Sequence, residues 1–212
     1  ICYTAAVPSK IQTGEKIDRM MKKRYFAIPI LAIALHFLLS NLLYFLVERL
    51  VLDVFHISPQ KFMNYSYWGE ILIYAVLILV FFTLYKLLWR KEISEPRTAT
   101  NFKDVLGSLV VGFGICGISG LWLMLAAQLP SLQKSGEAMN AGAENIAGGN
   151  AFGTFMIAVI AAPIVEEILF RGIVLRSMRK FTPAWAAILI SSVLFGAYHL
   201  NIVQAAYATL MG

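Results

Sequence analysis

Two adjacent glutamates and an arginine, Glu166, Glu167 and Arg171, interrupt a long apolar run. A charged side chain at membrane depth costs at least about 2.5–3.5 kcal/mol, so such residues usually face a protein interior or a water-filled cavity. A second apolar run carries Phe195 and His199, which share one helix face because they are four positions apart. If that face meets Glu166, the carboxylate and the imidazole can hold a water molecule and remove its proton.

Glu167 and Arg171 have the spacing and order of a helical ion pair, with the acid four positions before the base. Glu166 lies about 100° around the helix from Glu167 and can face a different neighbour. Pro163, one turn before Glu166, removes a backbone hydrogen bond and is expected to loosen or kink the helix there. The competing interpretation is an ion cluster that only packs helices, because perturbed acids also occur in structural networks. The histidine on the next run favours catalysis.

Membrane helices are the elements that must position these residues. The chain has 212 residues, of which 14% are charged, compared with about 25% in soluble domains. Five apolar runs are long enough to span a bilayer. They cover residues 25–47, 70–89, 105–129, 151–178 and 183–199, and a sixth run begins at Ile202. We therefore expect an all-α, polytopic transmembrane helix bundle over residues 21–212, preceded by a polar, poorly ordered tail at residues 1–20.

The net charge of +6 comes from basic residues that flank the apolar runs. This is the pattern of the positive-inside rule, so the lipid bilayer is the expected partner and nucleic acid is not. The basic segments 22–24, 86–103 and 176–180 are predicted to be cytoplasmic, together with the amino terminus. The loops 48–69 and 130–150 are predicted on the other side, and the second of them is expected to be a simple connector.

Other polar or small residues within the runs are predicted to serve packing. His36 is expected to be a core histidine hydrogen-bonded to a neighbouring helix. Gly112, Cys116 and Gly120 share one face at four-residue spacing, which predicts close helix packing and a buried cysteine. No disulfide between Cys116 and Cys2 is expected. A phosphate loop is not favoured, because no strand precedes these glycines and no Lys-Ser/Thr follows them.

The pattern E-E-x-x-x-R beginning at Glu166, followed on the next run by F-x-x-x-H beginning at Phe195, resembles the two leading motifs of the CPBP family of intramembrane proteases. This family includes CAAX prenyl endopeptidases and bacterial Abi-type proteins connected with bacteriocin processing or immunity. The close resemblance covers about residues 152–212, whereas the earlier runs match only as hydrophobic spans. Together, the two ordered motifs on successive helices are a specific signal.

The resemblance implies a role for each motif residue. Glu166 would be the general base on the hydrolytic water, and His199 would position and polarise the same water. Glu167 and Arg171 would support the site. The family also has a later histidine, followed by Asn or Asp, which stabilises the oxyanion. This chain has no later histidine, so we expect it to be truncated at its carboxyl end and its site to be incomplete.

Phe195 and Asn201 are expected to line the site. Asn201 could cap or reorient the end of the preceding helix, or lie in a short interfacial turn. A zinc site is less favoured than metal-free water activated by glutamate, so no cofactor is expected. The chain has no H-E-x-x-H motif and no cysteine pair with metal-type spacing, and Glu167 is accounted for by Arg171.

We therefore predict a hydrolase, an intramembrane endopeptidase that cleaves a peptide bond in a membrane-associated or prenylated, CAAX-type substrate. The resemblance also implies a bacterial plasma membrane protein. The alternative is a non-catalytic membrane scaffold or bacteriocin-immunity protein that uses the same polar cluster for packing. A small transporter with a proton relay is less favoured, because the chain shows no inverted repeat.

Overall fold

The structure is a computed structural model that describes residues 10–90, 101–145 and 150–212. Within these ranges the side chains of residues 10–22, 59–65 and 143–145 are not described. Every regular element in the described ranges is a helix, which confirms the predicted all-α fold. The helices are α1 (Lys10–Arg49), α2 (Pro59–Leu88), α4 (Phe102–Gln128), α5 (Pro130–Asn145), α9 (Ala184–Tyr198) and α10 (Ile202–Met211), together with a continuous helical run over residues 151–178.

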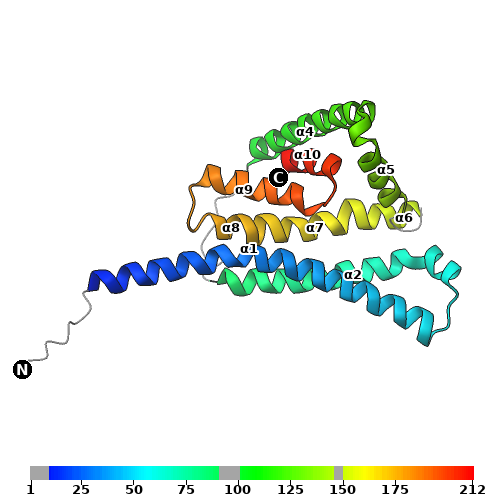
Figure 1. Cartoon of the computed structure of the whole chain (residues 1–212), viewed down its shortest axis with the longest axis horizontal. Coiled ribbons are helices and arrows are strands. Elements are labelled where there is room, and N and C mark those ends of the chain that lie inside the picture. Colours follow the sequence, from blue (N-terminus) through cyan, green and yellow to red (C-terminus); the bar gives the residue numbers. More distant parts are fainter. Residues whose placement is uncertain (1–9, 91–100, 146–149) are drawn as a thin grey trace, which may run out of the picture.

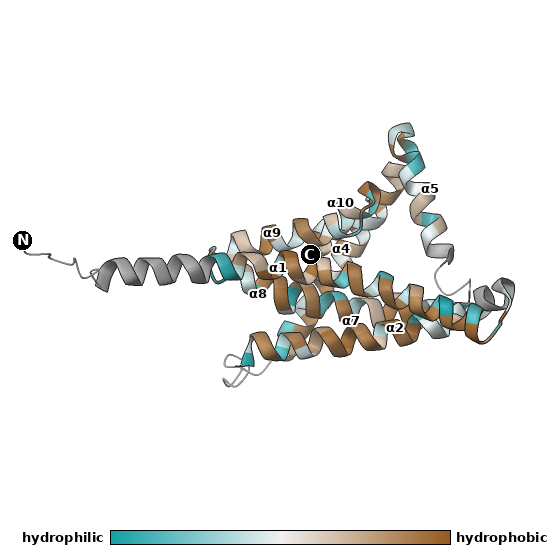
Figure 2. Ribbon diagram, turned by 60° about the horizontal axis from the view of Figure 1, so that its bottom comes forward, coloured by the Kyte–Doolittle hydropathy of each residue, from teal (hydrophilic) through white to brown (hydrophobic). Residues whose placement is uncertain are grey.

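The helices are stacked in layers around that continuous run (Figure 1). On one side, α1 and α2 form an antiparallel pair, and both contact the run. On the other side, α9 folds back onto the run and α10 packs against α9. α4 packs against α10, and α5 contacts both α4 and α10. Apolar residues cover much of α1, α2 and α7 (Ala162–Glu166, part of the continuous run), whereas α5 is more polar (Figure 2). The run that carries the two glutamates is therefore the central element of the bundle.

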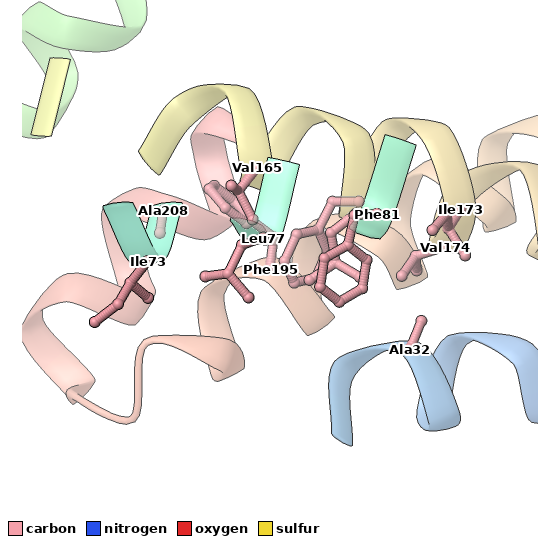
Figure 3. Close-up of a cluster of buried hydrophobic side chains, with 11 residues drawn as sticks. Ala32, Ile73, Leu77, Phe81, Val165, Ile173, Val174, Phe195 and Ala208 are labelled. Carbon is pink, nitrogen blue, oxygen red and sulfur yellow. The ribbon is translucent and has the colours of Figure 1, made fainter. Parts of the chain in front are cut away.

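The inward face of the run builds the main hydrophobic core (Figure 3). Val165, Leu169 and Ile173 recur every four positions on this face and are at most 1% exposed. They pack in one cluster with buried side chains of α2, which include Leu77 and Phe81. Because helices in a bilayer associate through close van der Waals packing, this face fixes the rotation of the run about its axis. It therefore also fixes the direction in which Glu166, next to Val165, can point.

Three described helical stretches are long and apolar enough to cross a membrane, namely Lys23–Val54, Ser66–Leu88 and Phe102–Gln128. They identify the chain as an integral membrane protein. α9 and α10 are apolar but shorter than a typical span. The count of five spans and the start of a sixth therefore stays a prediction.

The first two helices extend beyond their apolar parts. α1 begins at Lys10, so the polar segment predicted to be a poorly ordered tail is helical from that residue, and residues 1–9 lie outside the described part. The segment is rich in Lys, Glu, Gln, Met and Arg, which favour helix without any apolar periodicity. α1 also continues through the π-helical turn η1 (Leu50–Val54), and α2 begins at Pro59 inside the predicted loop. Proline is favoured at this first helical position.

The connector predicted for residues 130–150 is wrong over its first part, because α5 is a helix. Leu132, Ser135, Gly136 and Met139 are its partly buried positions, and their spacing is that of one helix face. This face packs against α4 and α10. The segment is rich in small and polar residues, and only two large apolar side chains, Leu132 and Met139, lie on its packed face. The sequence therefore contains little sign of an amphipathic helix.

The glycine face predicted for close packing is also wrong. A Cβ atom built on Gly112 or Gly120 would meet nothing within 4 Å, and Cys116 between them is exposed rather than buried. α4 packs instead through the neighbouring face of Ser119 and Trp122, where Ser119 is buried and the Trp122 indole N–H donates a 2.9 Å hydrogen bond to a carbonyl of α10. Four-residue spacing identified a face, but it could not determine which face of α4 meets a neighbour.

Gly196 lies where the backbones of α9 and α10 are in close contact. A Cβ atom there would collide with Thr209 Oγ1 and lie 2.5 Å from the backbone oxygen of Ala205. The backbone oxygen cannot rotate away as a side chain can. A side chain of any size at this position must therefore separate the two helices.

We expect Gly196→Ala to lower the free energy of unfolding by about 1–3 kcal/mol, the usual cost of overpacking. The measurement is reversible unfolding of the full-length protein in mixed micelles. Gly117→Ala is the matched control, because a Cβ there meets nothing within 4 Å and alanine favours helix over glycine. Equal stability of Gly196→Ala and Gly117→Ala would contradict the close contact between α9 and α10.

Candidate active site

The central run confirms the helix predicted for residues 151–178, but it alternates between α-helical and π-helical turns. Its segments are α6 (Ala151–Thr154), η3 (Phe155–Ala161), α7 (Ala162–Glu166), η4 (Glu167–Val174) and α8 (Leu175–Met178). π-helical turns are rare and are frequently found at functional sites. Here the change from α7 to η4 falls between the two glutamates.

Pro163 lies at the start of α7, directly after the π-helical segment η3. The N–H of Ala162 bonds to the carbonyl of Ile157, five residues earlier, which is the π-helical pattern. Because Pro163 has no N–H, it cannot continue the α-helical bonding of the preceding turn. The predicted loosening of the helix at Pro163 therefore takes the form of wider turns in a helix that remains continuous.

Glu166 and His199 converge in the structure. The distance from Glu166 Oε1 to His199 Nε2 is 4.0 Å, and the two side chains are 26% and 13% exposed. This distance is too long for a direct hydrogen bond. A water placed about 2.8 Å from both atoms would subtend an angle of roughly 90°, which two ordinary hydrogen bonds allow. The gap thus has the size of one bridging water.

The second ring nitrogen of His199 determines what Nε2 can do. Nδ1 lies 2.9 Å from the backbone oxygen of Phe195. A carbonyl oxygen only accepts hydrogen bonds, so Nδ1 must carry the proton. In the neutral imidazole, Nε2 is then the acceptor. The lone pair of Nε2 is therefore available on the side of the ring that faces Glu166.

A tight turn after α9 holds His199 in place. Leu200 has a φ of 53°, in the left-handed region, which costs a non-glycine residue roughly 1–2 kcal/mol. Asn201 stabilises the turn, since its Oδ1 accepts from the N–H of Gln204 and its amide donates to the backbone oxygen of Ser135. Asn201 thus lies in a turn, which was one of the two interpretations of this residue. It caps α10, which follows it, rather than α9, which precedes it.

Glu167 and Arg171 form the predicted ion pair, with 3.5 Å between Glu167 Oε2 and Arg171 Nε. Glu167 is 65% exposed and lines a different cavity, of about 320 Å³, together with Arg171 and Arg176. Arg171 also donates from Nη2 to the backbone oxygen of Met211, at 2.7 Å. Its guanidinium carbon lies 5.0 Å from the ring centre of Phe195. Arg171 therefore connects η4 to α9 and α10, whereas Glu166 faces the imidazole.

Phe195 lies in the core and supports the residues around it (Figure 3). Its ring packs edge to face against Phe170 and against His199, with 5.0 Å between the ring centres in each pair. Arg171 covers it from the other motif. Phe195 is 7% exposed, so it is a buried core residue in contact with His199 and Arg171 rather than part of an open surface.

His36 is a buried core histidine, as predicted, and its partner is a residue that the sequence did not single out. Its Nδ1 lies 2.9 Å from the hydroxyl of Tyr198. Tyr198 directly precedes His199, so this contact links α1 to the end of α9. The hydroxyls of Tyr198 and Tyr74 are also close enough to Glu166 to interact with it electrostatically. The position of Tyr198 next to His199 was the only signal for it in the sequence.

The Glu166–His199 gap, its turn and the supporting Arg171 all lie in the last third of the chain. Residues 148–212 match the family model of the type II CAAX prenyl endopeptidases, described as Rce1-like. This match confirms the resemblance drawn from the two motifs, and the Rce1-like segment contains every predicted site residue. α1, α2 and α4 lie outside it. No curated protein and no solved structure matches the chain.

The residues of the Rce1-like segment do not make a ready metal site. Among the described residues, no three His, Cys, Asp or Glu side chains are grouped closely enough to hold a metal ion. Glu166 and His199 would supply two ligands, whereas catalytic zinc sites have three from the protein. Glu167 is engaged with Arg171. The absence of a cofactor stays a prediction, based on this set of donors.

Proposed function

We propose that this protein is an intramembrane endopeptidase that hydrolyses a peptide bond in a membrane-associated or prenylated, CAAX-type substrate. The observation that supports this most strongly is the 4.0 Å gap between Glu166 Oε1 and His199 Nε2 inside an Rce1-like segment. The distance is too long for a direct hydrogen bond, and it is at the outer limit for an ion pair with a protonated imidazole. With a neutral His199 whose proton is on Nδ1, a water between the two acceptors Oε1 and Nε2 accounts for the distance.

In the proposed reaction, the water donates one hydrogen to Glu166 and the other to Nε2 of His199. Its lone pairs then point away from both groups and are free to attack a substrate carbonyl carbon. As the new C–O bond forms, Glu166 accepts one proton, and the carbonyl becomes a tetrahedral oxyanion. Glu166 then returns this proton to the nitrogen of the departing amine, and the C–N bond breaks. General base catalysis of this kind contributes about 10²–10⁴-fold in rate.

The supporting residues would act by position. Arg171 ties the central run to α9 and α10, and Phe195 packs between Arg171 and His199. Glu167 holds Arg171 in place. We also propose that the amino terminus of the bundle is cytoplasmic, because the basic segments alternate with the apolar runs. The resemblance to the CPBP family leads us to propose a bacterial plasma membrane.

The test uses the full-length protein in liposomes with a farnesylated CAAX-type peptide, in water enriched in ¹⁸O. We expect two peptide fragments in the mass spectrum, with one ¹⁸O atom in the new carboxylate. A peptide that stays intact through prolonged incubation would contradict the proposal. Stability losses in Arg171→Gln, without cleavage of any peptide by the wild type, would favour the scaffold or immunity alternative.

A further inference from the structure

A cavity of about 330 Å³ lies between α1, α2 and the end of α9. His36, Tyr44, Glu70, Tyr74 and Tyr198 are among its lining residues. Most of this lining comes from α1 and α2, outside the Rce1-like segment, and Glu166 and His199 are not part of it. The volume is within the range of small-ligand pockets.

The polar wall from α1 offers several hydrogen-bond acceptors, beside donors that remain on Asn41 and Tyr44. The hydroxyl of Ser40 donates to the backbone oxygen of His36, at 2.7 Å, and the amide of Asn41 donates to that of Phe37, at 2.7 Å. The hydrogen of Ser40 is therefore already used inside the helix. The side-chain oxygens of Ser40 and Asn41 still have lone pairs to accept hydrogen bonds. Such a wall suits a ligand group that carries several N–H donors.

Glu70 adds a carboxylate to this wall. It is half-buried and lies four residues into the candidate span Ser66–Leu88, about 6 Å along the helix axis. No Lys, Arg or His among the described side chains lies within ion-pair distance of it. An acidic side chain within a span is costly and usually has a partner or a function. A cationic ligand would supply the missing partner.

Aromatic rings make up much of the remaining wall. Phe37, Tyr44, Tyr74 and Tyr198 all line the cavity. Aromatic rings attract an ammonium group placed over their faces, and more strongly where the group is desolvated. Acceptor oxygens, one carboxylate and several aromatic side chains together match the chemistry of a primary ammonium group on an apolar stem, which is the side chain of lysine.

Tyr74 and Tyr198 connect the cavity to the surroundings of the Glu166–His199 gap. Tyr74 lines the cavity, and it is close enough to both Glu70 and Glu166 to interact with them electrostatically. On the other wall, the rings of Tyr198 and His199 have centres 5.6 Å apart. An extended peptide advances about 3.3–3.6 Å per residue. A lysine within a few residues of the bond at His199 could therefore place its side chain in the cavity.

We propose that this cavity is a specificity subsite that binds the ammonium group of a lysine side chain in the substrate, with Glu70 as its counter-charge. The inference rests on the proposed endopeptidase function. It adds to that function a preference for substrates with a basic residue near the cleaved bond.

The test is a lysine scan of a farnesylated CAAX-type peptide, in which a single lysine or its uncharged analogue norleucine occupies each position in turn. Full-length protein is reconstituted in phosphatidylglycerol nanodiscs, which contain no lipid amine. At one position, we expect kcat/KM for lysine to exceed that for norleucine at least tenfold. Glu70→Gln should reduce this ratio to about one, and Glu70→Lys should reverse it in favour of a glutamate-containing peptide. The control Glu137→Gln, an exposed acid on α5, should keep the wild-type ratio.

Measurements of peptide binding test the lysine subsite separately from the proposed endopeptidase activity. The Kd of each peptide is measured with Glu166→Gln protein, which is expected not to cleave it. A Glu70-dependent, tenfold tighter Kd for the lysine peptide supports the subsite even if the wild type cleaves nothing. Cleavage with a lysine-to-norleucine ratio that is unchanged in Glu70→Gln overturns the subsite alone. Loss of the lysine preference when phosphatidylethanolamine is added would assign the cavity to a lipid amine and would also overturn it.

Discussion

Glu166→Gln is expected to lower kcat for peptide hydrolysis by about 10²–10⁴-fold, the contribution of a positioned general base. The amide has the size of the carboxylate and can still hydrogen-bond the water, but it cannot accept a proton. KM should change little, because the residue acts on the water rather than on substrate binding. The measurement is steady-state cleavage by the full-length protein in liposomes.

Glu167→Gln is the matched control, since it makes the same chemical change one residue further along the same helix. Glu167 is 65% exposed and pairs with Arg171 rather than with His199. Exposed ion pairs of this kind contribute only about 0–1 kcal/mol, so the variant should keep at least a tenth of wild-type kcat. Equal losses in the two variants would contradict the assignment of the base to Glu166.

His199→Ala is expected to lower kcat by about 10²-fold, with partial recovery when free imidazole is added. The substitution removes the acceptor that aligns the water but leaves Glu166 in place. Imidazole can enter the space left by the side chain and supply the same nitrogen, a recovery that a purely structural role would not produce. Cleavage by His199→Ala at the wild-type rate would rule out a role for this ring.

His56→Ala is the control for that experiment. His56 is exposed and follows the π-helical turn after α1, with a φ of 50°. Its substitution should leave both kcat and the imidazole response unchanged. Together, the two variants show whether the loss of activity is specific to the imidazole of His199 or follows from the removal of any histidine.

The part of the fold that the sequence predicted well is the part with strong local signals. The run over residues 151–178 and the helix α9 follow from continuous apolar composition and a proline break between them. The meeting of Glu166 with His199 was predicted from the cost of a lone acid in a span and from the order of the two motifs in the family that the chain resembles. The Glu167–Arg171 pair follows from four-residue spacing alone.

The features that sequence reasoning missed depend on contacts between distant segments. The glycine face of α4, which was predicted to pack against another helix, is open in the structure. α10 contacts α4 on the side of Trp122 instead. The helix α5 is amphipathic only in relation to α4 and α10. The contact of His36 with Tyr198 joins residues 162 positions apart, and no local pattern encodes such a partner. The π-helical turns around Pro163 also have no established sequence signature beyond the proline.

The most direct test of the central claim is a double-mutant cycle of kcat between Glu166→Gln and His199→Ala. If Glu166 and His199 act on the same water, substituting His199 in the Glu166→Gln variant should lower kcat little further. The effects of residues that act as one unit on kcat are strongly non-additive. We predict that the double variant is no slower than Glu166→Gln alone, within about threefold. Losses that multiply to the product of the two single effects would show that Glu166 and His199 act independently, and would contradict the shared water.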